Sequence, residues 1–281
     1  MKTCVIFLLL SAILYGCSSR QTSPVEQPQP AQEAVAMASD EVEAIKVETA
    51  SGTVQIVPVY HGTMYLVVGE EVVWIDPWSK AQIAEGPKGK TIFITDIHFD
   101  HLDEAAMKTV LDGEEGQIIV PAAAAEQMRD LKPTKILANG ESFDLGFMQV
   151  IATPMYNNHR GPEPGKLFHD KGRGNGYLFS VGGKQIYLAG DTACTDEMRG
   201  LKDIDVALVP MNLPYTMTPE EAGACVMAFQ PKMAVPYHYK DSDLSGFFGA
   251  FEESSKVQPQ FIDFYPGESW QWRPKVESAL D

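Results

Sequence analysis

Four side chains that can bind a metal ion stand within six positions of one another, directly after an apolar run that predicts a strand at residues 91–95. These side chains are Asp96, His98, Asp100 and His101. Positions 96 and 98 project to the same side of an extended segment, and the other two lie at the turn into a helix predicted at residues 103–111, with Asp103 as its N-cap. Imidazole and carboxylate ligands without cysteine suit zinc, iron or manganese. A helix-capping loop with incidental histidines explains one of these residues but not all four.

Short apolar and β-branched runs on both sides of this cluster predict further strands. Before it, antiparallel strands are expected at residues 45–49, 53–59, 64–68 and 72–75. After it, strands are expected near residues 136 and 143 and at residues 148–151, 177–181, 185–188, 206–209, 233–236 and 260–264. Helices are expected at residues 121–128, 219–229 and 244–252, and a loop at residues 153–176. A loop of that length inside a compact domain usually serves function.

The first residues of the chain predict export rather than a part of the fold. Met1 and Lys2 form a short positive segment, and residues 5–14 form an apolar run too short to span a membrane as a mature helix. The run ends in Leu-Tyr-Gly-Cys, which resembles the lipobox of bacterial lipoproteins. It predicts a signal peptide at residues 1–16 and acylation of Cys17. The alternative is an ordinary secreted protein with a chance cysteine at this position.

Residues 17–41 are mostly Ser, Gln, Pro, Ala and Glu, so they bury too little apolar surface to fold and are expected to form a flexible tether. The expected location is the cell envelope, anchored by lipid to a membrane on the periplasmic side. Ser18 after the cysteine favours the outer membrane of a Gram-negative cell. Cys194 and Cys225 then remain, either as small buried side chains or as one disulfide in an oxidising compartment.

The formal net charge of −16 constrains the partners of the protein. Long-range repulsion opposes binding to a nucleic-acid backbone or to an anionic membrane surface. No nucleic acid is therefore expected as a partner, and a small-molecule substrate is. The sequence leaves the oligomeric state open.

Four segments together resemble the metallo-β-lactamase superfamily. The cluster described above resembles the signature His-x-His-x-Asp-His, and residues 188–192, Leu-Ala-Gly-Asp-Thr, resemble the segment whose aspartate bridges two metals. Residues 236–239, Pro-Tyr-His-Tyr, resemble the strand end with the last metal histidine, and residues 74–77, Trp-Ile-Asp-Pro, resemble an early strand end. The resemblance implies an α/β fold, a four-layer αββα sandwich, over residues 42–268, with a C-terminal tail at residues 269–281.

The residues at 155–157, 168–172 and 211–218 are similar to the branch of this superfamily around ascorbate-6-phosphate lactonase. That branch contains several hydrolytic activities, and a fold does not choose among them.

The resemblance implies one or two divalent metal ions, zinc in the first place, with manganese and iron as alternatives. The implied ligands are Asp96, His98, Asp100, His101, Asp191 and His238. At the first of the two metal positions, Asp96 stands in place of the first histidine and Asn157 in place of a later one. If both metals bind, the extra carboxylate favours manganese or iron. If one binds, Asp96 and Asn157 are relics or lie behind the ligands.

The activity implied is hydrolysis, in which a metal-bound hydroxide attacks an ester, lactone or phosphoester of a small substrate. Asp100 would orient the hydroxide and Asp191 would bridge the metals. His169 is a second catalytic candidate, as proton donor or substitute ligand, with a structural loop histidine as the alternative. The rival functions are a phosphodiesterase or nuclease-like activity on the same fold, and a non-catalytic lipoprotein whose degenerate site binds a metal or a partner.

Five residues are candidates for contact with the substrate: Tyr156, Asn157, Lys171, Arg173 and Tyr215. Residues 157–175 hold four cationic against two acidic side chains, which predicts docking of a phosphate or carboxylate group of the substrate. The alternative is a solvated loop with scattered charge. His61 is expected to pack near a strand turn, with lining of the cavity as the alternative, and His159 is expected to face solvent.

Overall fold

The computed structural model describes residues 43–113, 115–252 and 255–268. The predicted signal peptide, Cys17, the tether and the C-terminal tail lie outside these residues. Among the described residues, no helix has the length and apolar character needed to cross a membrane.

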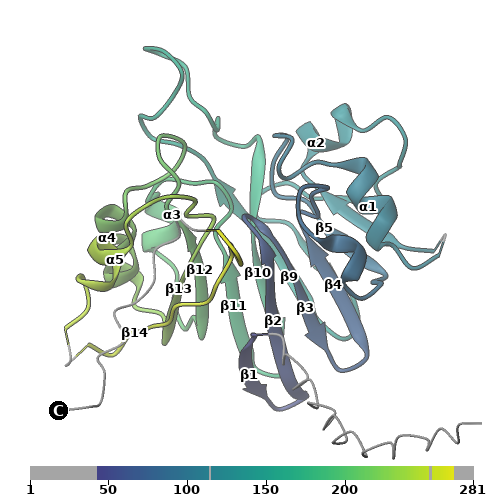
Figure 1. Ribbon diagram of the computed structural model, residues 1–281, viewed down its shortest axis with the longest axis horizontal. Coiled ribbons are helices and arrows are strands. Elements are labelled where there is room, and N and C mark those ends of the chain that lie inside the picture. Colours follow the sequence, from purple (N-terminus) through teal and green to yellow (C-terminus); the bar gives the residue numbers. More distant parts are fainter. Residues whose placement is uncertain (1–42, 114, 253–254, 269–281) are drawn as a thin grey trace, which may run out of the picture. The chain divides into compact units, whose positions relative to one another are not determined.

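The described strands form two seven-stranded sheets (Figure 1). The first has the order β1 (Ile45–Thr49), β2 (Gly52–Tyr60), β3 (Thr63–Val68), β4 (Glu71–Ile75), β5 (Thr91–Phe93), β6 (Gln117–Val120) and β7 (Lys135–Ile136). The second has the order β14 (Gln258–Pro259), β13 (Met233–Tyr237), β12 (Val206–Pro210), β11 (Lys184–Leu188), β10 (Gly174–Val181), β9 (Gln149–Met155) and β8 (Ser142–Asp144).

Both sheets have the same pairing pattern. In the first, β1 to β4 pair antiparallel and β4 to β7 pair parallel. In the second, β8 to β11 pair antiparallel and β11 to β14 pair parallel. The sequence carries no obvious internal repeat, so the relation between the two halves is visible only in their topology.

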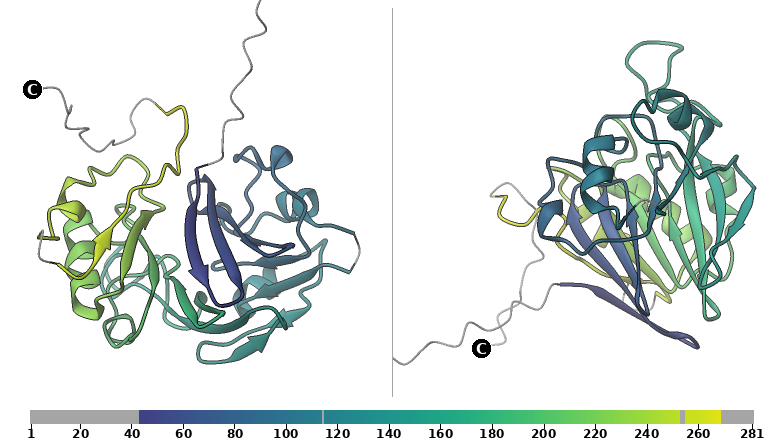
Figure 2. Two further views of the ribbon diagram at one scale, coloured as in Figure 1. Left: turned by 90° about the horizontal axis from the view of Figure 1, so that it is seen from below. Right: turned by 90° about the vertical axis from the view of Figure 1, so that its right-hand side faces the viewer.

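Helices cover the outer faces of the two sheets (Figures 1 and 2). They are α1 (Glu104–Val110) and α2 (Ala122–Gln127) on the first sheet, α4 (Pro219–Phe229) and α5 (Ser245–Phe248) on the second, with α3 (Asp196–Arg199) beside α4 and a 3₁₀ turn, η1, at Ile83–Glu85. Buried Trp74 and Ile92 of the first sheet pack with Met107 and Val110 of α1. The layers confirm the αββα sandwich, and Asp103 caps α1 as predicted by accepting hydrogen bonds from two backbone N–H groups.

The inner faces of the sheets share one hydrophobic core. The ring centroid of Phe93 on β5 lies 4.9 Å from that of Tyr177 and 5.3 Å from that of Phe179, both on β10. All three are fully buried, and burial of such a side chain contributes roughly 1.5–3 kcal/mol. The hydroxyl of Tyr177 donates to the carbonyl of Ile94 at 2.6 Å, so the second sheet holds the segment that leads to the metal-binding cluster.

Two predicted elements differ from the structure, and the strand β6 was not among the predicted elements. The apolar run that forms β6 was not predicted as a strand, because four residues carry too little periodicity to separate a buried strand from a loop. The helix predicted at 244–252 is the single turn α5, which ends at Gly249. The strand predicted at 260–264 is wrong: β14 precedes it, and the carbonyl of Phe264 instead accepts a hydrogen bond from the N–H of His61.

Candidate metal centre

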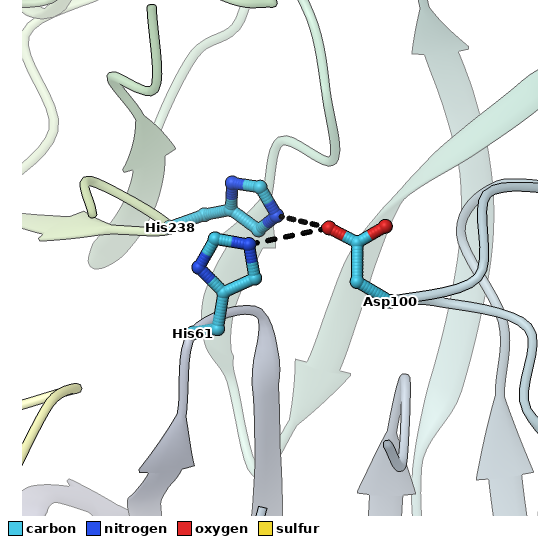
Figure 3. A group of neighbouring side chains, drawn as sticks. All are labelled: His61, Asp100 and His238. Carbon is cyan, nitrogen blue, oxygen red and sulfur yellow. Dashed lines mark hydrogen bonds and ion pairs between the residues drawn. The ribbon is translucent and has the colours of Figure 1, made fainter. Parts of the chain in front are cut away.

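The predicted ligands lie where strands of both sheets end. Residues 96–101 follow β5, Asp191 follows β11, and His238 follows β13. The tight turn between β2 and β3 adds His61 (Figure 3). Gly62 of this turn has no room for a side chain, because a Cβ atom there would lie 2.9 Å from Cδ2 of His238. The strand ends therefore gather side chains from distant parts of the sequence.

The second metal position comprises Asp100, His101, Asp191 and His238. Nε2 of His101 lies 3.5 Å from Oδ2 of Asp191, and Nε2 of His238 lies 3.5 Å from Oδ2 of Asp100. Nε2 of both histidines and Oδ1 of Asp191 are buried, with no hydrogen-bond partner in the described part of the chain. Buried polar atoms without partners are rare and costly. Their convergence, with carboxylate and imidazole chemistry, fits a divalent cation.

Asp76 holds His101 through the Nδ1 atom of its imidazole ring. Nδ1 of His101 lies 2.8 Å from Oδ2 of Asp76, and this carboxylate also accepts hydrogen bonds from the N–H and the hydroxyl of Thr95. A hydrogen bond at Nδ1 leaves the Nε2 lone pair directed at the cavity, which is how carboxylates orient ligating histidines. The amide nitrogen of Asn212 lies 3.2 Å from Nδ1 of His238 and holds that ring in place. Asp76 belongs to the segment Trp-Ile-Asp-Pro noted in the sequence, but only the folded structure shows that it contacts His101.

His61 lines the cavity and contacts the metal-binding cluster directly, so the alternative role holds and not the packing role expected first. Its Nε2 lies 3.2 Å from Oδ2 of Asp100 (Figure 3). Its Nδ1 lies 2.5 Å from the hydroxyl of Tyr265. That hydroxyl accepts the N–H of Lys240, so it donates to Nδ1 and His61 donates from Nε2 to Asp100. Burial and the neighbouring His238 lower the pKa of His61 to about 4, which keeps the ring neutral near pH 7.

The first metal position comprises Asp96, His98 and His169, and shares Asp191 with the second. Nδ1 of His98 lies 2.7 Å from Oδ2 of Asp96. Nε2 of His169 lies 3.8 Å from the same oxygen and 3.3 Å from Oδ2 of Asp191, and it has no hydrogen-bond partner in the described segments. His169 therefore lies at the first metal position, for which the sequence has Asn157 in place of the later histidine.

Asn157 supports His169 rather than lining the cavity. Its Oδ1 accepts hydrogen bonds from Nδ1 of His169 at 2.7 Å and from the backbone N–H of the same residue at 2.9 Å. Its amide nitrogen donates to the carbonyl of Tyr215. The predicted contact of Asn157 with substrate is contradicted, because the side chain is buried behind His169.

The cations of the predicted anion-docking loop are paired with carboxylates, and docking of a substrate anion at this loop stays a prediction. Arg173 pairs with Asp96, and Lys171 pairs with Glu197 at 2.7 Å. The other two pairs are Arg160 with Glu221 and Lys166 with Glu163. The hydroxyl of Tyr156 likewise donates to Glu197. Tyr156, Lys171 and Arg173 do not line the cavity, Tyr215 does, and His159 is exposed as predicted.

A cavity of about 760 Å³ opens over the two metal positions. Aromatic side chains dominate its wall: Tyr60, Trp78, Phe99, Phe168, Tyr215 and Tyr265. Phe99 is 73% exposed and Tyr215 is 40% exposed. Lys80 and Lys240 are balanced by Asp241 and Glu268 on the same wall, so the mouth has no net charge of its own.

The carboxylates of the second position attract positive charge. Burial opposes ionisation of Asp100 and Asp191, but the neighbouring histidines outweigh it and hold the pKa of both groups below the ordinary range. Burial also opposes protonation of His101, but Asp100, Asp191 and Asp76 raise the pKa of its imidazole well above the ordinary value. A metal ion at this position would displace that proton.

The αββα fold, with histidines and aspartates converging at the strand ends, is the arrangement of a metal-binding enzyme. A family model described as a beta-lactamase superfamily domain matches residues 68–239. The chain belongs to this family, the metallo-β-lactamase superfamily.

Relatives of the chain bear out the enzyme class. A UPF0173 metal-dependent hydrolase of Symbiobacterium thermophilum is 29% identical over 232 residues, which cover 75% of this chain and 96% of the relative. The crystal structure of a proposed metal-dependent hydrolase from Parabacteroides distasonis has a TM-score of 0.72 and 33% identity, and covers 78% of this chain and 98% of that chain. A metallo hydrolase from Ignicoccus hospitalis shares the fold, with a TM-score of 0.60 and 21% identity over 75% of this chain and 95% of that chain. The predicted class, a metal-dependent hydrolase, is confirmed.

Proposed function

We propose that the protein hydrolyses an ester, lactone or phosphoester bond of a small molecule, with two divalent metal ions in adjacent positions. One observation carries the proposal: four buried atoms without hydrogen-bond partners in the described residues belong to the candidate ligands. They are Nε2 of His101, His169 and His238 and Oδ1 of Asp191. The Oδ2 atom of Asp191 is within 3.5 Å of Nε2 of both His101 and His169, which supports its role as the residue common to both positions.

The second position would be held by Asp100, His101, Asp191 and His238, and the first by Asp96, His98, His169 and Asp191. Zinc is our first candidate. Manganese and iron are the alternatives, because the carboxylate at position 96 makes the first position richer in oxygen ligands. A bound divalent ion supplies positive charge that polarises the carbonyl or phosphoryl oxygen and lowers the pKa of a water molecule.

The residues of the chain orient the reactants. Asp100 is proposed to orient the attacking water, and His61 keeps the Asp100 carboxylate in place through Nε2. His169 is assigned to metal binding rather than to proton donation, because Asn157 engages its Nδ1 and its Nε2 faces Asp96 and Asp191.

The wall of the cavity supports a substrate with an apolar, planar part next to the bond that is cleaved. Exposed Phe99 lies between His98 and Asp100 in the sequence, so a ring bound against it would be adjacent to the ligands. Offset stacking between aromatic rings contributes roughly 0.5–1.5 kcal/mol. An anionic group of the substrate would meet Lys80 or Lys240. We include lactones because of the resemblance to the branch around ascorbate-6-phosphate lactonase.

The test combines metal content with a panel of substrates. The full chain, purified without chelator, should contain two equivalents of metal by elemental mass spectrometry and should hydrolyse aryl esters or lactones. Preferential cleavage of phosphodiesters would favour the rival phosphodiesterase activity. A chain with no metal and no hydrolysis would support the non-catalytic lipoprotein instead.

Phe99→Ala tests the apolar mouth. The KM for aryl esters should rise roughly two- to tenfold, as expected for the loss of one ring contact, while the KM for small alkyl esters changes less. Ile136→Ala is the matched control, because Ile136 is also an exposed apolar residue and does not line the cavity.

We also propose that the protein is a lipoprotein of the cell envelope, acylated at Cys17 and anchored on the periplasmic side. The disulfide between Cys194 and Cys225, with Cα atoms 5.7 Å apart, supports an oxidising compartment. Metabolic labelling with palmitate should mark the wild-type chain and not Cys17→Ser. Equal labelling of both would contradict acylation at this cysteine.

A further inference from the structure

We infer that Arg173 sets the charge of the first metal position by acting on Asp96, so that Asp96 and Arg173 together take the place of the first histidine of the superfamily signature. The inference rests on the proposed function, because it concerns divalent ions at both positions. Arg173 is a positioning residue in this account, since its guanidinium contacts Asp96 and does not line the cavity.

The pair has the geometry of a specific, two-point contact. Nε of Arg173 donates to Oδ1 of Asp96 at 3.0 Å, and a terminal nitrogen of the guanidinium donates to Oδ2 at 2.9 Å. Asp96 is 0% exposed. Two parallel charge-assisted hydrogen bonds fix the carboxylate in one orientation, which a lysine could not do.

The chain reaches this geometry by a close approach of β10 to the loop after β5. The N–H of Asn175 donates to the carbonyl of Thr95 at 2.9 Å. Gly174 permits the approach, because a Cβ atom there would lie 2.8 Å from the same carbonyl oxygen and still closer to the side chain of Met155. This backbone contact places Arg173, which directly precedes β10, beside Asp96.

The charges of the two residues explain why they occur together. A neutral imidazole at position 96 would contribute no charge, whereas a carboxylate contributes one negative charge. The guanidinium of Arg173 carries one positive charge and cancels that negative charge. The pair therefore has the net charge of the histidine that it replaces, although its donor atom is oxygen.

The pairing also has a cost for metal binding. Both oxygens of Asp96 already accept hydrogen bonds from Arg173, and Oδ2 also lies 2.7 Å from Nδ1 of His98. A cation at the first position must compete with these contacts and with the charge of the guanidinium. Among the described residues, no arginine or lysine pairs with the carboxylates of the second position, so we expect it to bind more tightly.

The experiment titrates zinc or manganese alone into the metal-free full chain and follows binding by calorimetry. The wild-type chain should bind two equivalents, the second more weakly than the first. In Arg173→Gln the second equivalent should bind at least about tenfold more tightly, because a unit charge a few ångströms from a divalent ion has been removed. The first equivalent should be unchanged.

Two further variants separate charge compensation from a structural role. Asp96→His leaves Arg173 uncompensated and should weaken the second equivalent, whereas Asp96→His with Arg173→Gln should restore it. Arg160→Gln is the matched control. Arg160 lies in the loop that leads to Arg173, but it pairs with Glu221 of α4, away from the metal positions. Circular dichroism checks that each variant folds.

The outcomes distinguish the inference from the proposed function. If Arg173→Gln leaves the second equivalent unchanged or weaker, or if the double variant does not recover it, Arg173 does not set the charge of this position. If the wild-type chain binds no metal, the proposed function fails. If it binds one equivalent only, and Arg173→Gln does not gain another, the inference fails while the second metal position stands.

Discussion

The two candidate metal positions share Asp191, yet they are supported differently. At the second position, Nε2 of His101 and of His238 have no hydrogen-bond partner within the described chain, and each ring is held at its other nitrogen. At the first position, Asp96 is paired through both oxygens with Arg173. The carboxylates of the second position therefore face only histidines among the described residues, whereas Asp96 of the first position has a guanidinium partner.

This difference suggests how a superfamily site can tolerate the loss of a signature histidine. Replacement of imidazole by carboxylate at position 96 adds negative charge, and Arg173, in the turn directly before β10, cancels it. The later histidine is replaced by His169, which Asn157 orients. Each change at the first position thus has a compensating residue, while the second position keeps the ligand set that the sequence predicts.

The largest expected effect comes from His101→Ala, which removes a ligand of the second position. Metal content should fall by at least one equivalent and hydrolysis by more than about 100-fold, because losing a ligand exceeds the cost of losing its hydrogen-bonding neighbour. Elemental mass spectrometry and initial rates measure both. His159→Ala, at an exposed histidine, is the control. Full activity in His101→Ala would exclude this residue from the site.

Asp76→Asn should have the next largest effect, and only on the second position. An amide can still accept from Nδ1 of His101 but supplies no negative charge, so affinity for the first equivalent should fall roughly 10–100-fold. Calorimetric titration of zinc measures this. An unchanged affinity would show that the Asp76 carboxylate does not support His101.

Asn157→Ala should weaken only the first position. His169 loses the acceptor for its Nδ1 and its backbone N–H, so the second equivalent should bind about tenfold more weakly while the first is unchanged. The same titration measures the effect. Equal weakening of both equivalents would mean that Asn157 supports the fold and not one position.

The smallest effect is expected at Asp205, a carboxylate paired with Lys184 and Lys232 away from the cavity. Burial opposes its ionisation, but Lys232, the N–H of Gln185 and Lys184 outweigh it and lower its pKa. A lowered pKa in the folded state stabilises the protein above the unfolded pKa, about 3.9, and this contribution is lost as pH falls through the folded pKa.

Asp205→Asn should therefore cost about 1 kcal/mol at pH 7 and less near pH 3, without changing metal content. Thermal unfolding at the two pH values measures the difference. Asp203→Asn, at an exposed position two residues earlier, should have no comparable effect. A change in metal affinity in Asp205→Asn would show that charge at a distance, and not contact, tunes the metal centre.

Much of the fold was predictable because its signals are local. Hydrophobic runs predicted most strands, and Thr218, Pro219 and Glu221 mark the start of α4, where the structure has a capping box. Elements with weak periodicity were not predicted correctly, as β6 and residues 260–264 illustrate. Nothing in the sequence near His61 indicated that Tyr265, more than 200 residues away, would orient it toward Asp100.

The sequence by itself determined the superfamily and the candidate ligands of the second metal position, because those residues lie in short motifs at strand ends and strand ends meet in this fold. Only the tertiary structure decided which residues support them. Asp76 behind His101, Asn157 behind His169 and Arg173 beside Asp96 are contacts between separate elements. Hydrogen bonds and charge pairing act over a few ångströms in space, and spacing along the chain does not report that distance.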